Sequence, residues 1–377
     1  MFRCFYRKVA RKSRIYEYLN SLIPRGITYQ AKGSYTKRFY DAGDFDISIP
    51  AYEEYAFQLV PGRLINIDKH FWGVIQNTNI TRGSGSVIRA TGKCLKIWLD
   101  WRITVPDDIG DARAPAGYSS CAGSSEKVMK YYVKRNLAEP AYEYRVIPGL
   151  YVSEDMGRGL KDDAYYSRFE SVLEVEKKLG ERAKLGYDIS FDGENFVFDV
   201  FEGMDRTADQ KLIKPVIFSV ERGTLSSFQK ADETGHEKTA FYCTRAGAEF
   251  EDEAYTQTYY FEEQPAGLAR KEKHLDISIT TEGDQYAEFE ELSRKNMEEY
   301  KPTQSFSCDI TRESYSYLAD YEVGDYVTIK DSLTGVTADR QIISVTTQTG
   351  DTAVSYSAEF GDTRITRMDI FRQSLGG

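Results

Sequence analysis

Apolar and polar residues alternate along much of this chain, and a period of two predicts half-buried strands. Apolar side chains fall on every second position in residues 43–49, which predicts a strand there. Residues 187–191 and 196–201 alternate in the same way on either side of Asp192-Gly193. Because Asp-Gly is a preferred connection between antiparallel strands, this pattern predicts a β-hairpin.

A second hairpin is predicted where residues 66–77 and 87–101 flank a glycine-rich connection at residues 81–86. Its glycines permit the positive φ angles that a tight turn needs. The same glycines could instead form a phosphate-binding loop. However, the Gly-Lys-Ser/Thr ending of such a loop is absent and no helix pattern follows. The hairpin is therefore the favoured interpretation.

Two apolar stripes with the spacing of amphipathic helices follow residue 125. They consist of Val128, Met129, Tyr132, Val133 and Leu137, and of Phe169, Val172, Leu173, Leu179 and Ala183. Ser167 and Glu170 stand at capping-box spacing before the second stripe, and Gly186 follows it. These signals predict a helix that begins at Ser167 and ends at Gly186.

Short strand patterns predominate after residue 200. They occur at residues 215–220, 239–244, 254–261 and 275–279, and again as short runs within 306–367. One helical stripe interrupts them, formed by Tyr286, Phe289, Leu292, Met297 and Tyr300. Pro302 ends this predicted helix. A small β-barrel is predicted for the C-terminal strands, because a closed sheet leaves no unpaired edge.

The predicted fold class is α+β, mainly β, in several domains, because 377 residues exceed what one core usually organises. Residues 106–125 are rich in Asp, Gly, Ala, Pro and Ser, which marks a boundary or an exposed loop. We expect a β-barrel-like domain at 1–105 and an α/β insertion with two helices at 106–200. A second β-rich domain ending in a helix is expected at 201–302, and barrel strands at 303–377 could complete its barrel.

The composition favours folded, strand-rich domains over disorder, since 41% of residues are hydrophobic and there are 28 Tyr and 20 Phe. The net charge of −10 disfavours nucleic-acid binding, which normally rests on basic surface. The N-terminus is a local exception, with Arg3, Arg7, Lys8, Arg11, Lys12 and Arg14 close together. A solvated basic edge is favoured there over contact with nucleic acid or anionic lipid.

No stretch approaches the roughly 20 apolar residues that span a bilayer, and no apolar run of a secretion signal follows the basic N-terminus. We therefore expect no membrane span, and synthesis and folding in a cytoplasm. The cysteines are odd in number and far apart, which favours reduced core thiols over a disulfide framework or a zinc site. They are Cys4, Cys94, Cys121, Cys243 and Cys308.

Each catalytic motif that we considered lacks a residue that it requires. The histidines are isolated from one another: His70, His236 and His274. His236-Glu237 would begin a zinc-protease helix, but Ala240 stands where the second histidine is required. A small-residue loop contains Ser119, Ser120 and Cys121. It lacks the second glycine of a nucleophile elbow, so nucleophilic catalysis is disfavoured.

Other binding chemistry is equally weak. Asp188, Asp192, Gly193 and Asp199 have calcium-loop spacing, but such a loop usually ends in Glu between helices, so a hairpin turn is favoured. No acidic pair for glycoside hydrolysis can be assigned among 59 acidic residues. Tyrosines that could stack on sugars are expected in cores or interfaces instead: Tyr151, Tyr165, Tyr166, Tyr259 and Tyr260. The sequence predicts no catalytic, cofactor-binding or metal-binding residue, and no enzyme.

Several segments share their order and spacing with one known family. They are residues 38–45, 92–96 with Arg102, 200–207, 216–219 with 223–225, 267–272 and 321–327. In these segments the chain resembles a siphophage tail-tip or baseplate hub family that has relatives in contractile tails and tailocins. The segments are distributed over most of the length of the chain. The first thirty residues depart from the family pattern. Residues 11–26 are therefore expected to be an extra basic segment.

The resemblance implies a structural hub subunit at the tail tip of a virion. Its expected assembly is a homotrimeric ring that caps or extends the tail tube, with two small tube-protein-like β-barrels from each subunit. The implied partners are a distal tail or tail-tube protein, the tape measure protein, and a distal fibre or spike protein. DNA would transit the channel without specific binding, and the acidic balance suits a channel that must not retain a polyanion.

Two other functions stay open. A tail-associated cell-wall hydrolase would require a cleft with convergent acid and base groups. A carbohydrate receptor-binding module would bind glycans saturably through its tyrosines. The hub interpretation predicts neither behaviour, but it predicts self-association through large interfaces.

Overall fold

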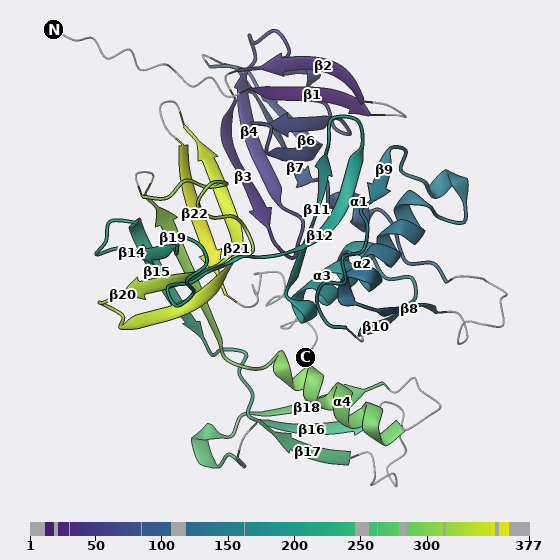
Figure 1. Cartoon of the computed structure of the whole chain (residues 1–377), viewed down its shortest axis with the longest axis vertical. Coiled ribbons are helices and arrows are strands. Elements are labelled where there is room, and N and C mark those ends of the chain that lie inside the picture. Colours follow the sequence, from purple (N-terminus) through teal and green to yellow (C-terminus); the bar gives the residue numbers. More distant parts are fainter. Residues whose placement is uncertain are drawn as a thin grey trace. The chain divides into compact units, whose positions relative to one another are not determined.

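The computed structural model shows two compact units, drawn in Figure 1. The structure describes residues 12–18, 22–29, 31–83, 85–106, 118–161, 163–245, 256–261, 263–278, 285–311, 314–350 and 354–361. The first unit consists of residues 1–229 and 307–363, and the second contains residues 230–306. The division into the four expected domains stays a prediction. The basic side chains before Lys12, Cys4 and most of the 106–125 loop lie outside the described residues.

The N-terminal strands of the first unit alternate between buried and exposed positions as the sequence predicts. In β4, Phe45, Ile47 and Ile49 are buried while the residues between them are half-buried. Neighbouring strands pair antiparallel in the order β3-β4-β7-β6-β5-β1-β2. Their bounds are β1 (Ser13–Tyr18), β2 (Leu22–Thr28), β3 (Lys32–Arg38), β4 (Asp44–Pro50), β5 (Leu64–Ile67), β6 (Phe71–Thr81) and β7 (Val87–Cys94), with a short 3-10 helix at Ala56–Gln58.

The second half of this sheet comes from strands that follow residue 204. They are β13 (Asp205–Arg206), β14 (Ile217–Ser219), β15 (Leu225–Glu233), β19 (Thr303–Ile310), β20 (Tyr326–Asp331), β21 (Val336–Thr349) and β22 (Val354–Phe360). Together the two sets form one sheet of 14 strands. Strand β21 is its centre, because it pairs with β22, with β20 and with β3.

The mainly β architecture is confirmed, but the strands of the described residues close no barrel. Strand β3 pairs with β4 on one edge and with β21 on the other. Across this junction Thr36 and Thr346, 310 residues apart in sequence, share a hydroxyl hydrogen bond of 2.8 Å. To close an N-terminal barrel, the free edge of β3 would have to pair with another N-terminal strand. It pairs with β21 instead, and this pairing joins the N- and C-terminal strands.

A helical layer follows β7 and packs on a small sheet. Helix α2 contacts α3 and β12, and α3 contacts β11, so their apolar stripes enter one core with the N-terminal strands (Figure 1). The bounds are α1 (Ile97–Asp100), β8 (Ser119–Gly123), α2 (Ser125–Val133) with a π turn at Lys134–Ala138, a 3-10 helix at Glu143–Arg145, β9 (Leu150–Val152), β10 (Asp163–Ser167), α3 (Val172–Ala183), β11 (Leu185–Phe191) and β12 (Phe196–Glu202). Both predicted hairpins, β6-β7 and β11-β12, are confirmed. The strand expected to continue to residue 101 ends at Cys94, however, and α1 follows it.

The predicted boundaries of the second helix are wrong. Ser167 is the last residue of β10, and Phe169 has a φ of 57°, which interrupts a right-handed helix. Helix α3 starts only after Ser171. At its other end the left-handed residue is Lys184, so the helix stops before Gly186, which lies inside β11. Capping signals in the sequence therefore misplaced both ends. The predicted apolar stripe is confirmed from Val172 to Ala183, but Phe169 lies outside the helix and is exposed.

Helix α2 has a conventional N-cap. The extended Ser124 accepts a hydrogen bond at Oγ from the backbone N–H of Lys127, at 3.1 Å. We expect Ser124→Ala to lower the free energy of unfolding by about 1 kcal/mol, because one N–H of the first turn loses its partner. The urea midpoint of the purified variant measures this loss. Ser124→Thr is the control, because its hydroxyl can still accept from Lys127 and donate to Asp155. An equal loss in both variants would contradict the cap.

The second unit is a three-stranded sheet with a helix on one face. Strand β16 (Ala240–Arg245) pairs antiparallel with β17 (Thr256–Tyr260) and parallel with β18 (Glu272–Ile277). Helix α4 (Gln285–Glu298) contacts β16 and β18, and a 3-10 helix occupies Gly267–Ala269. Its core is formed by Phe241, Cys243, Leu275, Ile277, Phe289 and Met297. Within the described residues the strand patterns predicted for this region are confirmed. The predicted helix is also confirmed, although Tyr300 of its stripe lies beyond the end of α4.

The N-terminal region corrects another expectation. Residues 11–26 were expected to be an extra basic segment, but their described part forms β1 and the start of β2. Ile15 of β1 is fully buried, and β1 pairs with both β2 and β5. Basic residues stand among the apolar ones on this hairpin, so its strand pattern was not recognised in the sequence. Arg25, for example, pairs with Glu17 at 2.6 Å.

Candidate functional site

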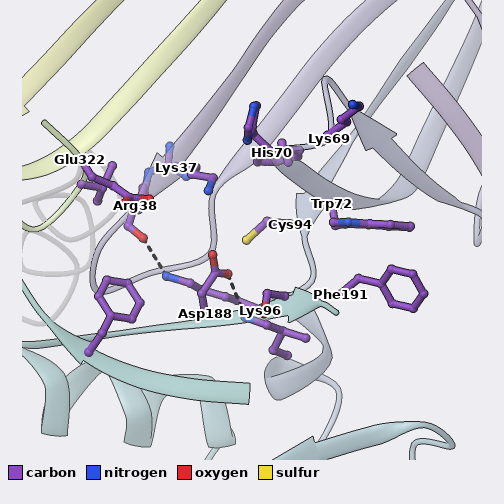
Figure 2. Close-up of a pocket in the computed structure, with 15 residues that line it drawn as sticks. Lys37, Arg38, Lys69, His70, Trp72, Cys94, Lys96, Asp188, Phe191 and Glu322 are labelled. Atoms are coloured by element: carbon purple, nitrogen blue, oxygen red, sulfur yellow. Dashed lines mark hydrogen bonds between the residues drawn. The ribbon is translucent and has the colours of Figure 1, made fainter. Parts of the chain in front are cut away.

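A cavity of about 140 Å³ opens in the first unit where several strand ends meet, and Figure 2 shows its lining. The end of β3 contributes Lys37 and Arg38, and the turn between β5 and β6 contributes Lys69 and His70. The start of β6, the end of β7 with Lys96, the outer half of β11, Phe201 of β12 and the loop before β20 complete the wall. These segments are far apart in sequence, so only the fold brings them together.

Lys96 is the buried cation of this cavity. Its Nζ donates hydrogen bonds to the carbonyl oxygens of Arg38, at 2.7 Å, and Phe39, at 3.3 Å. It also lies 4.5 Å from the centroid of the Tyr187 ring. Burial lowers the pKa of Lys96, because a charged ammonium is poorly solvated there. The side chain therefore fixes the corner after β3 against β11.

The rim of the cavity carries a turn with unusual backbone. Asp68 and Lys69 have φ angles of 53° and 68°, in the left-handed region. For Lys69, which lacks the side-chain compensation of Asp, this conformation costs about 1 kcal/mol. The turn is closed by a hydrogen bond from the His70 N–H to the Ile67 carbonyl at 3.2 Å. It presents the exposed Lys69 and His70 at the edge of the cavity.

A cysteine, a histidine and an aspartate line this cavity, which raises the question of catalysis. No motif in the sequence groups Cys94, His70 and Asp188. In Figure 2 the Cys94 sulfur points toward Asp188 rather than His70. The sulfur instead accepts a hydrogen bond from the Gly43 N–H at 3.2 Å, and burial raises the pKa of the thiol. A protonated thiol without a histidine base is not an activated nucleophile.

The other catalytic candidates are also explained by structure. Ser119 to Cys121 lie in β8, a strand paired with β10, and not in a loop as expected. His236 bonds the Lys301 carbonyl through Nε2 at 2.8 Å, and Glu237 forms an ion pair with Lys271. His274 bonds the Thr244 hydroxyl at 2.8 Å. The Thr244 hydroxyl donates its proton to Asp276 at 2.8 Å, so it accepts from the imidazole N–H and His274 does not act as a base toward it. Neither His236 nor Glu237 contacts a nucleophile in these interactions.

The calcium-loop spacing belongs to the β11-β12 hairpin. Asp192 accepts hydrogen bonds from the N–H groups of Glu194 and Asn195, at 2.8 and 2.7 Å, which closes the turn. Asp188 and Asp199 face each other in the strand register. Asp199 forms an ion pair with Lys130 at 2.9 Å. No group of three metal-ligating side chains occurs in the part of the chain that the structure describes.

The tyrosines considered for sugar stacking do not form one platform. Tyr151 is exposed on β9, and Tyr166 is exposed on β10, which belongs to a different sheet. Tyr165 packs against the core and donates to Glu170 at 3.2 Å. In the second unit Tyr259 packs against the core, and Arg270 lies 5.8 Å from the centroid of the Tyr260 ring.

The cysteines of the described residues are free thiols. Cys94, Cys243 and Cys308 are buried, and Cys121 is half-buried. Reduced core thiols are thus confirmed for three of the five cysteines. None of the helices in the described ranges is long and apolar enough to cross a membrane.

A second feature of the first unit is a surface rich in arginine and exposed aromatic rings. It forms where residues 101–105, 142–145 and 168–172 meet. Ile103 pairs with Ser171, and the Arg145 guanidinium donates to the Ile103 carbonyl at 2.7 Å. The exposed apolar side chains of this Arg–aromatic surface are Trp101, Ile103, Tyr142, Tyr144 and Phe169.

Three arginines accompany these rings: Arg102, Arg145 and Arg168. Within the described part of the chain none of them forms an ion pair. Arg168 instead lies 5.4 Å from the centroid of the Phe169 ring. Tyr142 and Tyr144 stack at 5.5 Å. Trp, Tyr and Arg are the residues enriched at the centres of protein interfaces.

Sequence comparison decides the family. A family model described as siphovirus ReqiPepy6 Gp37-like protein matches residues 14–362. The chain belongs to this family. The match confirms the resemblance to a siphophage tail protein family, and it includes most of the β1-β2 hairpin. No curated protein sequence matches the chain.

Solved structures show which fold this siphovirus Gp37-like chain has. The tail protein from Neisseria meningitidis MC58 is similar with a TM-score of 0.55 and 12% identity, over 93% of this chain and 96% of that one. The 43 kDa tail protein of prophage MuSo2 from Shewanella oneidensis gives 0.56 and 12%, over 93% and 98%. Prophage tail protein gp18 from Listeria monocytogenes EGD-e gives 0.51 and 10%, over 97% and 98%. The chain therefore has a phage tail protein fold.

Proposed function

We propose that this chain is a structural hub subunit of a phage tail tip or baseplate, located in the virion. The observation that carries the proposal is the likeness to phage tail proteins along nearly the whole length of both chains. Membership of a siphovirus family supports the same location. The protein acts by assembly, and we propose no enzymatic activity for it.

The proposed assembly is a homotrimeric ring that caps or extends the tail tube. Its partners are a distal tail or tail-tube protein, the tape measure protein, and a distal fibre or spike protein. The Arg–aromatic surface supports a role in assembly, because Trp101, Tyr144 and Phe169 are each about half exposed or more, at 49, 81 and 52%. Clustered aromatic rings of this kind are typical of surfaces that another protein covers.

The channel of the ring would pass DNA without binding it. The net charge of −10 supports this part of the proposal, since acidic surface repels a polyanion. The chemistry of the cavity supports a structural protein as well. A thiol with a raised pKa and no histidine partner cannot start acyl transfer, and the described carboxylates in the cavity wall include no acid–base pair placed against a cleft of substrate size.

The test is an image of the purified phage tail at side-chain resolution. We expect three copies of the chain in a ring around an open channel at the distal end of the tube. Absence from the tail tip, or a ring of another symmetry, would sink the proposal. Zymography and glycan binding with the purified protein separate it from the alternatives. Clearing of cell-wall polymer would identify a hydrolase, and saturable glycan binding would identify a receptor-binding module.

A further inference from the structure

The size of the cavity limits what it can hold. Sites for small metabolites usually measure roughly 300–1,000 Å³. The cavity measures about 140 Å³, which suits one side chain better than a whole metabolite. It is also open at the Lys69 rim, where Lys69 and His70 are exposed. A side chain from another molecule could therefore enter it.

The charges of the lining select the kind of side chain. Four Lys and Arg side chains line the cavity against two carboxylates, those of Asp188 and Glu322. Arg38 is already paired with Asp44 at 2.6 Å. Within the described residues neither Lys37 nor Lys69 forms an ion pair. This local excess of cations stands in a chain of net charge −10, and the two ammonium groups that form no ion pair share the cavity wall with the carboxylates of Asp188 and Glu322.

The remaining wall is aromatic. Trp72 and Phe191 are both half-buried at the cavity, with ring centroids 5.1 Å apart. Figure 2 shows both rings on the same side of the hollow. Rings of this kind pack well against a short methylene stem. A cavity lined both by ammonium groups and by apolar rings thus matches a group with one negative charge and an apolar stem.

The strained turn is a separate observation at the same place. Two consecutive residues, Asp68 and Lys69, are held in the left-handed region. Such strain persists where surrounding structure imposes it, and it concentrates at binding sites. Here hydrogen bonds from the Asp68 N–H to the Lys12 carbonyl, at 3.3 Å, and from the His70 N–H to the Ile67 carbonyl fix the turn. The result is a Lys69 that is displayed at the rim.

We propose that the cavity is a carboxylate-binding site that takes an Asp or Glu side chain of a neighbouring tail subunit. Lys37 and Lys69 would bind the carboxylate, and Trp72 and Phe191 would enclose its stem. A phosphate dianion fits less well, because Asp188 and Glu322 in the same wall would repel it. The identity of the occupant as a tail subunit rests on the proposed function, whereas the binding chemistry rests on the cavity alone.

The binding chemistry is tested with the purified full chain and two small probes. We expect N-acetyl-glutamate N-methylamide to shift the amide NMR signals of residues around the cavity, and the uncharged glutamine analogue to shift them far less. Lys37→Gln and Lys69→Gln should each weaken the glutamate probe about tenfold, the loss of one charge-assisted contact. Lys161→Gln, an exposed lysine away from the lining, is the matched control.

Several outcomes would overturn the inference. The two probes could bind equally, the glutamate probe could fail to bind up to its solubility limit, or the cavity variants could bind like the control. Inorganic phosphate serves as a third probe at matched ionic strength. Stronger binding of phosphate than of the glutamate probe would show an oxyanion site of a different class and would contradict the proposal.

The occupant is tested in assembled tails. A photoreactive benzoylphenylalanine placed at Lys69 should cross-link to an Asp- or Glu-containing segment of a neighbouring subunit, and the same group at Lys161 should not. Cross-links confined to its own chain would refute the occupant. If the probe binds but images of the tail show no ring of this chain at the tip, the proposed hub function is wrong and the carboxylate site stands. If images show the ring but the probe does not bind, only the carboxylate site is wrong.

Discussion

Replacing Phe39 with alanine is expected to lower the free energy of unfolding of the first unit by about 3–5 kcal/mol. The Phe39 side chain is completely buried. Its ring makes edge contacts with Tyr40, at 4.9 Å, and with Phe201, at 5.5 Å between centroids. Loss of the ring leaves a cavity in a core that cannot fully collapse. Urea unfolding followed by circular dichroism measures the change.

Two glycines make the slot in which Phe39 lies. A methyl group on Gly186 or on Gly324 would come within 2.2 Å of the Phe39 ring. Gly186→Ala alone should therefore destabilise the unit by about 1–3 kcal/mol through overpacking. In the Phe39→Ala background the same methyl group enters vacated space, so its cost should largely disappear. This non-additivity is the signature of direct contact.

Gly83→Ala provides the matched control for the glycine pair. A methyl group at Gly83 would meet no atom within 4 Å, so we expect a change within about 0.5 kcal/mol in either background. If Gly186→Ala cost as much without the Phe39 ring as with it, backbone strain rather than the ring would be the cause, and the slot would be disproved.

Replacing Glu176 with leucine is expected to stabilise the first unit at neutral pH by about 1–3 kcal/mol. Glu176 lies on the buried stripe of α3 and is 0% exposed. Neither of its carboxyl oxygens has a hydrogen-bond partner within the described structure. Burial raises the pKa of Glu176 well above its ordinary value. An apolar side chain of similar volume would avoid this desolvation.

The same group makes stability depend on pH. Because the pKa is higher in the folded state, its contribution is fully present below the unfolded value of about 4.3 and is lost as pH rises through the folded pKa. Urea midpoints of the parent chain should therefore fall from pH 4 toward alkaline pH relative to those of Glu176→Leu. Glu174→Leu, at an exposed position on the same helix, is the control. Equal pH profiles for the parent chain and Glu176→Leu would refute the buried carboxyl.

Local patterns predicted the elements that local chemistry determines. The alternation of Phe45, Ile47 and Ile49 gave β4, and Asp192-Gly193 gave the turn of the β11-β12 hairpin. The start of α3 was misplaced because Ser167 bonds the Glu170 side chain instead of a backbone N–H, and because Phe169 adopts a left-handed conformation that the sequence does not indicate. A capping pair is a local signal, and here a neighbouring residue overrode it.

The β3-β21 junction and the cavity could not be predicted from the sequence for a different reason. Lys37, Lys69, Lys96 and Asp188 belong to separate segments, so no spacing relates them. That Lys37 and Lys69 form no ion pair can be seen only in the three-dimensional structure. One signal was present: Asp68-Lys69-His70, a short polar run between two apolar strands, marked a turn whose side chains had to be exposed. It indicated an exposed turn but not what surrounds it.

The β3-β21 junction also sets when the protein can fold during synthesis. Strand β3 leaves the ribosome early, yet its partner emerges roughly three hundred residues later, a delay on the order of tens of seconds. For that time β3 is an open edge on a nascent chain, available to β3 of the next chain on the same message. Most of the second unit is one contiguous segment, residues 230–306, whose sheet and helix need not wait. Slower initiation, which spaces ribosomes apart, should therefore raise the yield of soluble protein more than slower elongation.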